Sequence, residues 1–134
     1  MDWTDGRALI GTGTAFDPVN VGGKLVPIDQ TNNSYIFPGL SLGITASQAN
    51  RVTDLMIKAA AEELARHVPT LTDKNARLLP PISGSRQLSR SIALDVGKQA
   101  IAEGQAQVAD EESLKSELDR YIWEPKYVPY VRER

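Results

Sequence analysis

Apolar positions follow two different patterns along this chain, and the change falls near residue 34. Residues 7–12 form a short apolar run bounded by glycines, and its length predicts a buried strand better than a helix. In residues 18–28 two alternating segments flank Gly22 and Gly23, a pair typical of the turn of a two-stranded hairpin. We therefore expect one strand and one small hairpin in the first part of the chain.

Beyond residue 34 the apolar residues recur at helical spacing. This pattern predicts four helices, over residues 35–49, 53–67, 85–103 and 110–123. Thr53 suits the N-cap of the second helix, and Gly104 suits the C-terminal cap of the third. The apolar stripes predict these core positions: Met56, Ala60, Leu64, Leu88, Ile92, Val96, Leu114, Leu118, Tyr121 and Ile122. The chain should therefore be predominantly helical.

One face of the first predicted helix carries only small residues. Gly39, Gly43 and Ser47 are spaced four apart, so they lie on the same side of the helix. Small side chains allow another backbone to approach closely. We expect a tightly packed neighbour on this face.

Composition excludes several classes of protein. The chain has 134 residues, which suits one domain, and 15 basic against 17 acidic side chains do not provide the positive field that nucleic acid or an anionic membrane would require. Without cysteine there are no disulfides and no thiolate chemistry, and no apolar run is long enough to span a bilayer. The first residues lack the features of a signal peptide, so we expect a cytoplasmic protein.

The strongest candidates for chemistry are Asn32 and Asn33, which directly precede the first predicted helix. Each amide offers one carbonyl acceptor and two N–H donors, so the pair could hold a polar ligand from two directions. Asparagine is also among the best helix N-caps, and from spacing alone the cap is the better-supported interpretation. A single GxG, Gly11 to Gly13, is not followed by a helical pattern, so we interpret it as a structural turn and not as a phosphate-binding loop.

Two segments carry a resemblance to a known family. They are WTDGRALIGTGTAFDP, which begins at Trp3, and QTNNSYIFPGLSLG, which begins at Gln30. Both resemble the C-terminal part of the malic enzymes, a family that includes the malolactic enzymes. Residues 51–65, 78–82 and 88–101 are similar to later segments of the family, so the resemblance covers most of the chain. The expected fold class is accordingly α/β, as a C-terminal fragment of a Rossmann-like NAD-binding domain.

The resemblance implies an enzyme that oxidises L-malate with NAD and a divalent metal, Mn or Mg, and then releases pyruvate and CO2. A malolactic member would release L-lactate instead, and Ala15 before Phe16 is a turn variant reminiscent of those members. Asn33 is the residue implied to lie near the substrate and the nicotinamide, with Asn32 as its neighbour. The family's tyrosine and lysine acid/base pair and its metal ligands belong to upstream segments that this chain does not contain. We expect the isolated chain to be inactive.

The organisation that follows is a single partial domain. It comprises residues 1–34 with strand, hairpin and amide pair, residues 35–123 as the helical part, and residues 124–134 as an extended tail. The tail is rich in aromatic residues and proline, so we expect it to dock, either across its own helices or on another subunit or domain. Expected partners are L-malate, NAD, the N-terminal part of the same enzyme and further copies of it. The alternative is a free-standing helical protein-interaction module without catalysis.

Overall fold

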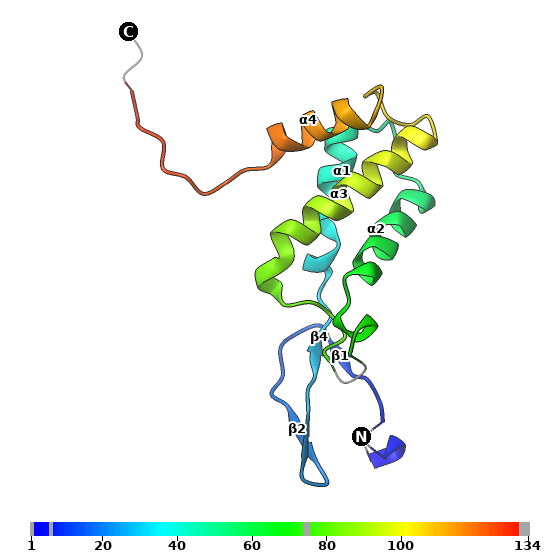
Figure 1. The fold of residues 1–134 in the computed structure, drawn as a ribbon, viewed down its shortest axis with the longest axis vertical. Coiled ribbons are helices and arrows are strands. Elements are labelled where there is room, and N and C mark those ends of the chain that lie inside the picture. Colours follow the sequence, from blue (N-terminus) through cyan, green and yellow to red (C-terminus); the bar gives the residue numbers. More distant parts are fainter. Residues whose placement is uncertain (1, 6, 74–75, 132–134) are drawn as a thin grey trace.

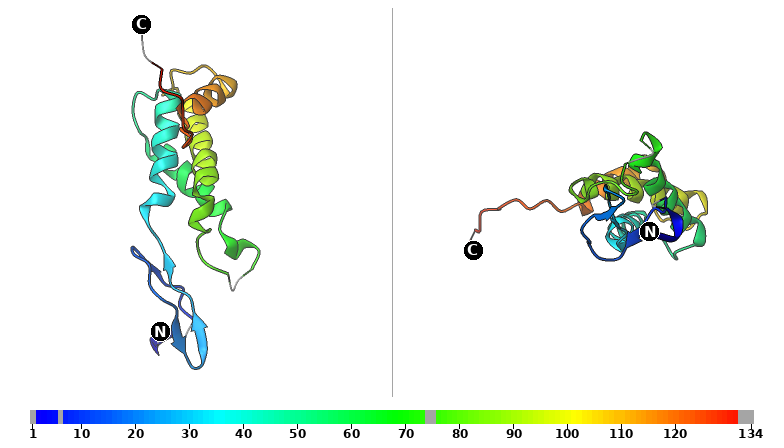
Figure 2. Two further views of the ribbon diagram at one scale, coloured as in Figure 1. Left: turned by 90° about the vertical axis from the view of Figure 1, so that its left-hand side faces the viewer. Right: turned by 90° about the horizontal axis from the view of Figure 1, so that it is seen from below.

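The computed structural model describes residues 2–5, 7–73 and 76–131. Its strands lie at one end of an elongated molecule and its four long helices at the other (Figure 1). The N-terminus lies at the strand end, whereas the C-terminal segment leaves from the helical end, and the turned views in Figure 2 agree with this arrangement. The two kinds of apolar pattern in the sequence therefore correspond to two ends of the structure.

Two small sheets make up the strand end. Strand β1 (Gly11–Thr12) pairs in parallel with β4 (Asp29–Gln30). Strands β2 (Val19–Val21) and β3 (Lys24–Val26) form an antiparallel hairpin. Its turn residues Gly22 and Gly23 have φ values of 58° and 85°, which side chains other than glycine rarely adopt. The predicted hairpin is confirmed.

The predicted first strand is shorter than expected. Only Gly11–Thr12 of residues 7–12 has strand geometry, because β4 is its single partner in the part of the chain that the structure describes. The preceding residue still takes part in pairing, since the backbone N–H of Asp29 donates to the carbonyl of Ile10 at 2.9 Å. Two strands of two residues do not form a stable sheet alone. This parallel pair therefore resembles the edge of a larger sheet and needs further strands to be stable.

All four predicted helices are present, with slightly different ends. They are α1 (Phe37–Ser47), α2 (Asp54–Arg66), α3 (Ser85–Ala102) and α4 (Glu111–Tyr121). Single 3-10 turns occur at η1 (Asp2–Thr4), η2 (Asn33–Tyr35), η3 (Pro69–Leu71) and η4 (Ile82–Gly84). The first helix begins later than expected because η2 precedes it. The fourth ends earlier because Ile122 is extended, so Tyr121 remains 41% exposed and is not the core residue that its spacing predicted.

The small-residue face of α1 packs directly against α3. A Cβ atom on Gly39 would lie 2.6 Å from Cβ of Ile92, and one on Gly43 would lie 2.6 Å from the carbonyl oxygen of Ala93. Contacts this short are not possible for real side chains, so only glycine permits this separation of the helices. The expectation of a tight neighbour is confirmed. Buried residues on α3 and its neighbours form the main core: Leu40, Met56, Ala60, Leu88, Ile92, Val96 and Ala100.

The loops at the far end of the helices are joined by backbone hydrogen bonds. The N–H of Asn50, after α1, donates to the carbonyl of Gln105, after α3, at 2.9 Å. In the opposite direction, the N–H of Gln107 donates to the carbonyl of Ser47 at 3.0 Å. These two hydrogen bonds therefore link the end of α1 and the α1–α2 loop to the α3–α4 loop.

Thr53 combines a helix cap with a link between these loops. Its hydroxyl accepts a hydrogen bond from the N–H of Met56 at 3.2 Å and donates one to a carboxylate oxygen of Glu103 at 2.5 Å. We expect Thr53→Ala to lower the free energy of unfolding by about 1–2 kcal/mol, because both bonds are lost. Urea unfolding of the two proteins measures this difference. Thr53→Ser, which retains the hydroxyl, should recover most of it, and equal losses in both variants would contradict the explanation.

The C-terminal segment does not pack across its own helices. From Glu124 to Val131 the described chain is extended and exposed, and it projects away from α4 (Figure 1). Docking in cis, one of the two placements expected from sequence, is therefore not observed over these residues. Its proline residues, Pro125 and Pro129, are consistent with the extended course.

Candidate functional site

The amide pair lies at the carboxyl ends of the two parallel strands. Strand β1 leads into Gly13, and β4 leads through Thr31 into Asn32 and Asn33. The N–H of Thr31 donates to the carbonyl of Thr12 at 2.8 Å, so the two strand ends remain adjacent at this point. In open α/β sheets, ligands bind in the crevice outside the carboxyl ends of the strands. We call Asn32 and Asn33 the amide corner.

Asn32 is occupied by structural hydrogen bonds. Its Oδ1 accepts from the N–H of Ser34 at 2.9 Å, and its backbone is extended, as in an N-cap. Its Nδ2 donates to the carbonyl of Gly13 at 3.2 Å, and Nε2 of Gln30 donates to the same oxygen at 3.4 Å. The cap interpretation thus applies to the first asparagine, which fixes the end of β1 against the end of β4.

Asn33 has a different environment. It is the first residue of η2 and is exposed. Within residues 2–5, 7–73 and 76–131, its side-chain amide has no hydrogen-bond partner. The two adjacent amides therefore differ, since one positions the backbone and the other is available to a ligand.

Buried polar contacts of Tyr35 and Asp29 fix the chain beside the amide corner. Tyr35 is buried, and its hydroxyl donates to the carbonyl of Pro80 at 2.8 Å. Asp29, also buried, accepts a hydrogen bond from the N–H of Leu78. Burial raises the pKa of the Tyr35 phenol, and the charge of Asp29 adds to this, whereas Arg77 opposes it. The phenol therefore remains a neutral donor at physiological pH, and segment 78–80 is fixed beside η2.

The glycines of the GxG sequence have packing roles. A Cβ on Gly11 would lie 2.5 Å from Cγ2 of Thr31, so this glycine allows the close approach of β1 and the residue after β4. Gly13 is followed by irregular chain and the hairpin, not by a helix N-terminus. This geometry agrees with the interpretation as a structural turn, because a pyrophosphate site requires a helix to follow directly.

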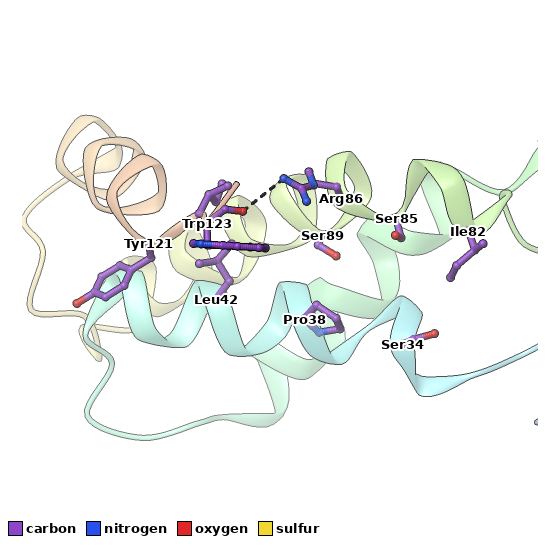
Figure 3. Close-up of a pocket in the computed structure, with 10 residues that line it drawn as sticks. Ser34, Pro38, Leu42, Ile82, Ser85, Arg86, Ser89, Tyr121 and Trp123 are labelled. Carbon is purple, nitrogen blue, oxygen red and sulfur yellow. Dashed lines mark hydrogen bonds between the residues drawn. The ribbon is translucent and has the colours of Figure 1, made fainter. Parts of the chain in front are cut away.

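A pocket that the sequence did not reveal lies beside the amide corner. Its volume is about 560 Å3, and it lies between α1, α3 and the segment that follows α4 (Figure 3). The lining residues are Ser34, Pro38, Leu42, Ile82, Ser85, Arg86, Ser89, Tyr121, Ile122 and Trp123. No local motif marks this pocket because its walls come from three elements that are distant in the chain. Of these lining residues, Ser34 is the one that directly follows Asn33 in the sequence.

The described residues hold neither a cluster of candidate metal ligands nor a membrane-spanning helix. No group of three or more histidine, cysteine, aspartate or glutamate side chains is arranged to hold a metal ion there. None of the described helices is long and apolar enough to cross a bilayer.

Comparison with known proteins identifies the family. The family described as malic enzyme, NAD binding domain, matches residues 1–101. An NAD-dependent malic enzyme of Pseudomonas aeruginosa is 46% identical over 132 residues, which cover 98% of this chain and 23% of that protein. An NAD-dependent malic enzyme of Pectobacterium atrosepticum is 47% identical over 130 residues, which cover 97% of this chain and 23% of that protein.

A solved structure agrees with the sequence comparisons. The crystal structure of the Entamoeba histolytica malic enzyme superimposes with a TM-score of 0.61 and 26% sequence identity, and it covers 85% of this chain and 24% of that one. The chain thus spans about a quarter of the length of these relatives. The expected α/β fold class, as part of a Rossmann-like NAD-binding domain, is confirmed. This chain belongs to the malic enzyme family, and its residues 1–101 are part of the family's NAD-binding domain.

Proposed function

We propose that this chain is the C-terminal part of an NAD-dependent malic enzyme, which converts L-malate to pyruvate and CO2. The observation that carries the proposal is the identity of 46% and 48% to NAD-dependent malic enzymes over 98% of the chain. A cytoplasmic enzyme made of several identical subunits, without affinity for nucleic acid or membranes, belongs to the same proposal. Its ligands are L-malate and NAD, and its closest partner is the remainder of the same subunit.

In this proposal Asn33 binds and orients malate. NAD, when bound, accepts the hydride from the hydroxyl-bearing carbon of the substrate. The amide of Asn33 donates to a carboxylate or hydroxyl oxygen of malate, which holds the substrate in place without adding a charge beside the acid/base groups. Support comes from its location at the carboxyl ends of parallel strands and from its amide, which lacks a partner among the described residues.

Asn32 has an indirect role in the same proposal. Its hydrogen bonds to Ser34 and Gly13 fix the backbone on both sides of the corner, so it determines where the amide of Asn33 lies. Because these bonds fix the site before a ligand binds, less conformational entropy is lost on binding. We therefore assign Asn33 to the ligand and Asn32 to the position of Asn33.

The metal of this reaction would have its ligands elsewhere in the subunit. The residues that the structure describes do not fit Mn or Mg, because they contain no suitable group of acidic or histidine side chains. The acid/base pair implied by the family resemblance is likewise assigned to the remainder of the subunit. It follows that the chain alone should not turn over malate.

A chimeric enzyme tests the proposal. The matching quarter of the Pseudomonas aeruginosa enzyme is replaced by this chain, and malate-dependent NADH formation is followed with lactate measured separately. We expect the chimera to form NADH and pyruvate, and we expect the 134-residue chain alone to form neither. Lactate without net NADH would identify the malolactic branch. The turn variant at Ala15 and Phe16 does not decide between this branch and the malic branch.

The control is the Pseudomonas enzyme truncated at the same boundary. If the chimera assembles but is as inactive as this truncated enzyme, the proposal is overturned and the interaction module becomes the better explanation. Turnover by the isolated chain would contradict the assignment of the acid/base and metal chemistry to the remainder of the subunit.

A further inference from the structure

Asn33 is followed by Ser34, and this order of residues exposes the asparagine to a reaction of its own. Of the five asparagines in the chain it is the only one followed by serine, while the others precede valine, asparagine, arginine and alanine. A small residue after asparagine leaves the next backbone nitrogen open to the side-chain carbonyl carbon, which makes the asparagine thermolabile. Asn33 is also exposed to water, and its amide has no partner among the described residues. It is therefore the asparagine that the sequence makes most prone to deamidation.

The reaction passes through a cyclic imide. The backbone nitrogen of Ser34 attacks Cγ of Asn33, so a bond between these two atoms forms while the bond from Cγ to Nδ2 breaks. The nitrogen of Ser34 gives up its proton, and Nδ2 leaves as ammonia. Water then opens the imide and leaves aspartate or isoaspartate in place of the asparagine. Because the attack is intramolecular, its rate depends on how the local structure places these two atoms.

The attacking nitrogen is held by the neighbouring asparagine. The N–H of Ser34 donates to Oδ1 of Asn32 at 2.9 Å, and this contact is partly buried. Attack requires this nitrogen to lose its proton and to direct its lone pair at Cγ of Asn33. A hydrogen bond that retains the proton opposes both changes. The side chain that caps η2 is therefore also placed to suppress the reaction.

The backbone of η2 opposes the reaction as well. Ring closure requires rotation about ψ of Asn33 away from its helical value. The N–H of Tyr35 donates to the carbonyl of Asn32 at 3.2 Å, and the N–H of Ile36 donates to the carbonyl of Asn33 at 3.0 Å. Tyr35 is buried and bonded to Pro80, which fixes the end of the turn in the core. The start of the turn is fixed instead by the side chain of Asn32.

We propose that Asn33 is a deamidation site and that Asn32 protects it by holding the N–H of Ser34. Deamidation removes both side-chain N–H donors of Asn33 and adds a negative charge to the amide corner. A corner that holds the dicarboxylate malate would then repel it, and this consequence rests on the proposed function. The protection does not rest on it, because it concerns only the chemistry of the chain itself.

Mass spectrometry of the full 134-residue chain tests the proposal. Folded wild-type protein and Asn32→Ala are incubated at mildly alkaline pH, which favours loss of the amide proton, and conversion is located within the tryptic peptide 25–51. The same peptide contains Asn50, whose conversion is the internal reference. We expect Asn33 to be converted at least about fivefold faster in Asn32→Ala, the factor that corresponds to one net hydrogen bond. In urea, where neither chain has this bond, the two rates should be equal.

Two further variants separate the hydrogen bond from general stability. Asn32→Asp keeps an oxygen acceptor and remains a good N-cap, so it should retain the slow conversion of the wild type. Thr53→Ala destabilises the fold at the far end of the helices and removes no contact of the amide corner. Conversion of Asn33 in this variant should therefore equal that of the wild type.

Four results would overturn the proposal. The first is equal conversion of Asn33 in folded wild-type protein and folded Asn32→Ala. The second is an equal acceleration in Thr53→Ala, which would assign the protection to the fold as a whole. The third is conversion of Asn32→Asp as fast as that of Asn32→Ala, because the acceptor would then not be the cause. The fourth is conversion of the folded wild type at its rate in urea, which would mean that Asn33 is not protected.

The chimeric enzyme separates this inference from the proposed function. As Asn33 is converted, malate-dependent NADH formation should fall in proportion to the converted fraction. Constant activity during conversion would contradict the role of Asn33 in binding malate. The mass measurement on the chain alone decides in either case whether Asn32 protects its neighbour.

Discussion

Replacing Asn33 by alanine in the assembled enzyme is expected to lower kcat/KM for malate by about 10–100-fold, with the fold intact. The loss corresponds to one hydrogen bond between a neutral donor and a charged substrate, plus the resulting loss of orientation. Steady-state kinetics of the chimeric enzyme give the value. Stability should not change, since the side chain is exposed and lacks a partner among the described residues.

Two controls make this test specific. Gln87→Ala removes a comparable amide from an exposed position on α3 and should leave kinetics and stability unchanged. Asn32→Ala should lower both stability and activity, because it removes the bonds to Ser34 and Gly13. If Asn33→Ala has wild-type kinetics, the assignment of this amide to the substrate is wrong.

The second large effect is expected from Gly43→Leu. Even a Cβ at this position would meet Cβ of Val96 at 2.8 Å and the Ala93 carbonyl at 2.6 Å, so α1 and α3 would have to separate. We expect the free energy of unfolding to fall by about 3 kcal/mol, the upper part of the usual range for an overpacked core. The midpoint and slope of urea unfolding measure this loss.

Gly84 provides the matched control for the helix interface. No atom lies within 4 Å of a Cβ built there, and its φ of −88° is accessible to alanine. Gly84→Ala should change the free energy of unfolding by less than about 1 kcal/mol. If Gly43→Leu were tolerated equally well, the glycine spacing would not explain how closely these helices pack.

Sequence was most informative where the physical cause is local. Gly22 and Gly23 predicted the hairpin because positive φ angles require glycine, and Thr53 marked a helix start because its hydroxyl caps the helix. In both of these cases the responsible atoms lie within a few residues of one another. The face formed by Gly39 and Gly43 predicted a close helix contact because it has no large side chain, but it did not identify the neighbour, which is the distant helix α3.

The remaining features depend on elements that are distant in the chain. Tyr121 falls on the apolar stripe of α4 yet stays partly exposed, because the helix ends there and the chain turns away from the bundle. The pocket between α1, α3 and the segment after α4 is formed by three separate elements, so no motif signals it. Which asparagine would act as the cap could not be read from spacing, because the choice depends on where the carbonyl of Gly13 lies in space.

The hydrogen-bonded pair of loops beyond α1 and α3 affects how the molecule can open. Because Asn50 and Gln107 join the two loops in both directions, the four helices should exchange their amide protons largely as one cooperative unit. The strands, with a pairing of only two residues, have no such reinforcement and should open far more often. Asn33 lies at the border between these two regions. The geometry of its amide therefore depends on the strands that complete the sheet as well as on Asn32, and binding of those strands is expected to make openings of the corner rarer.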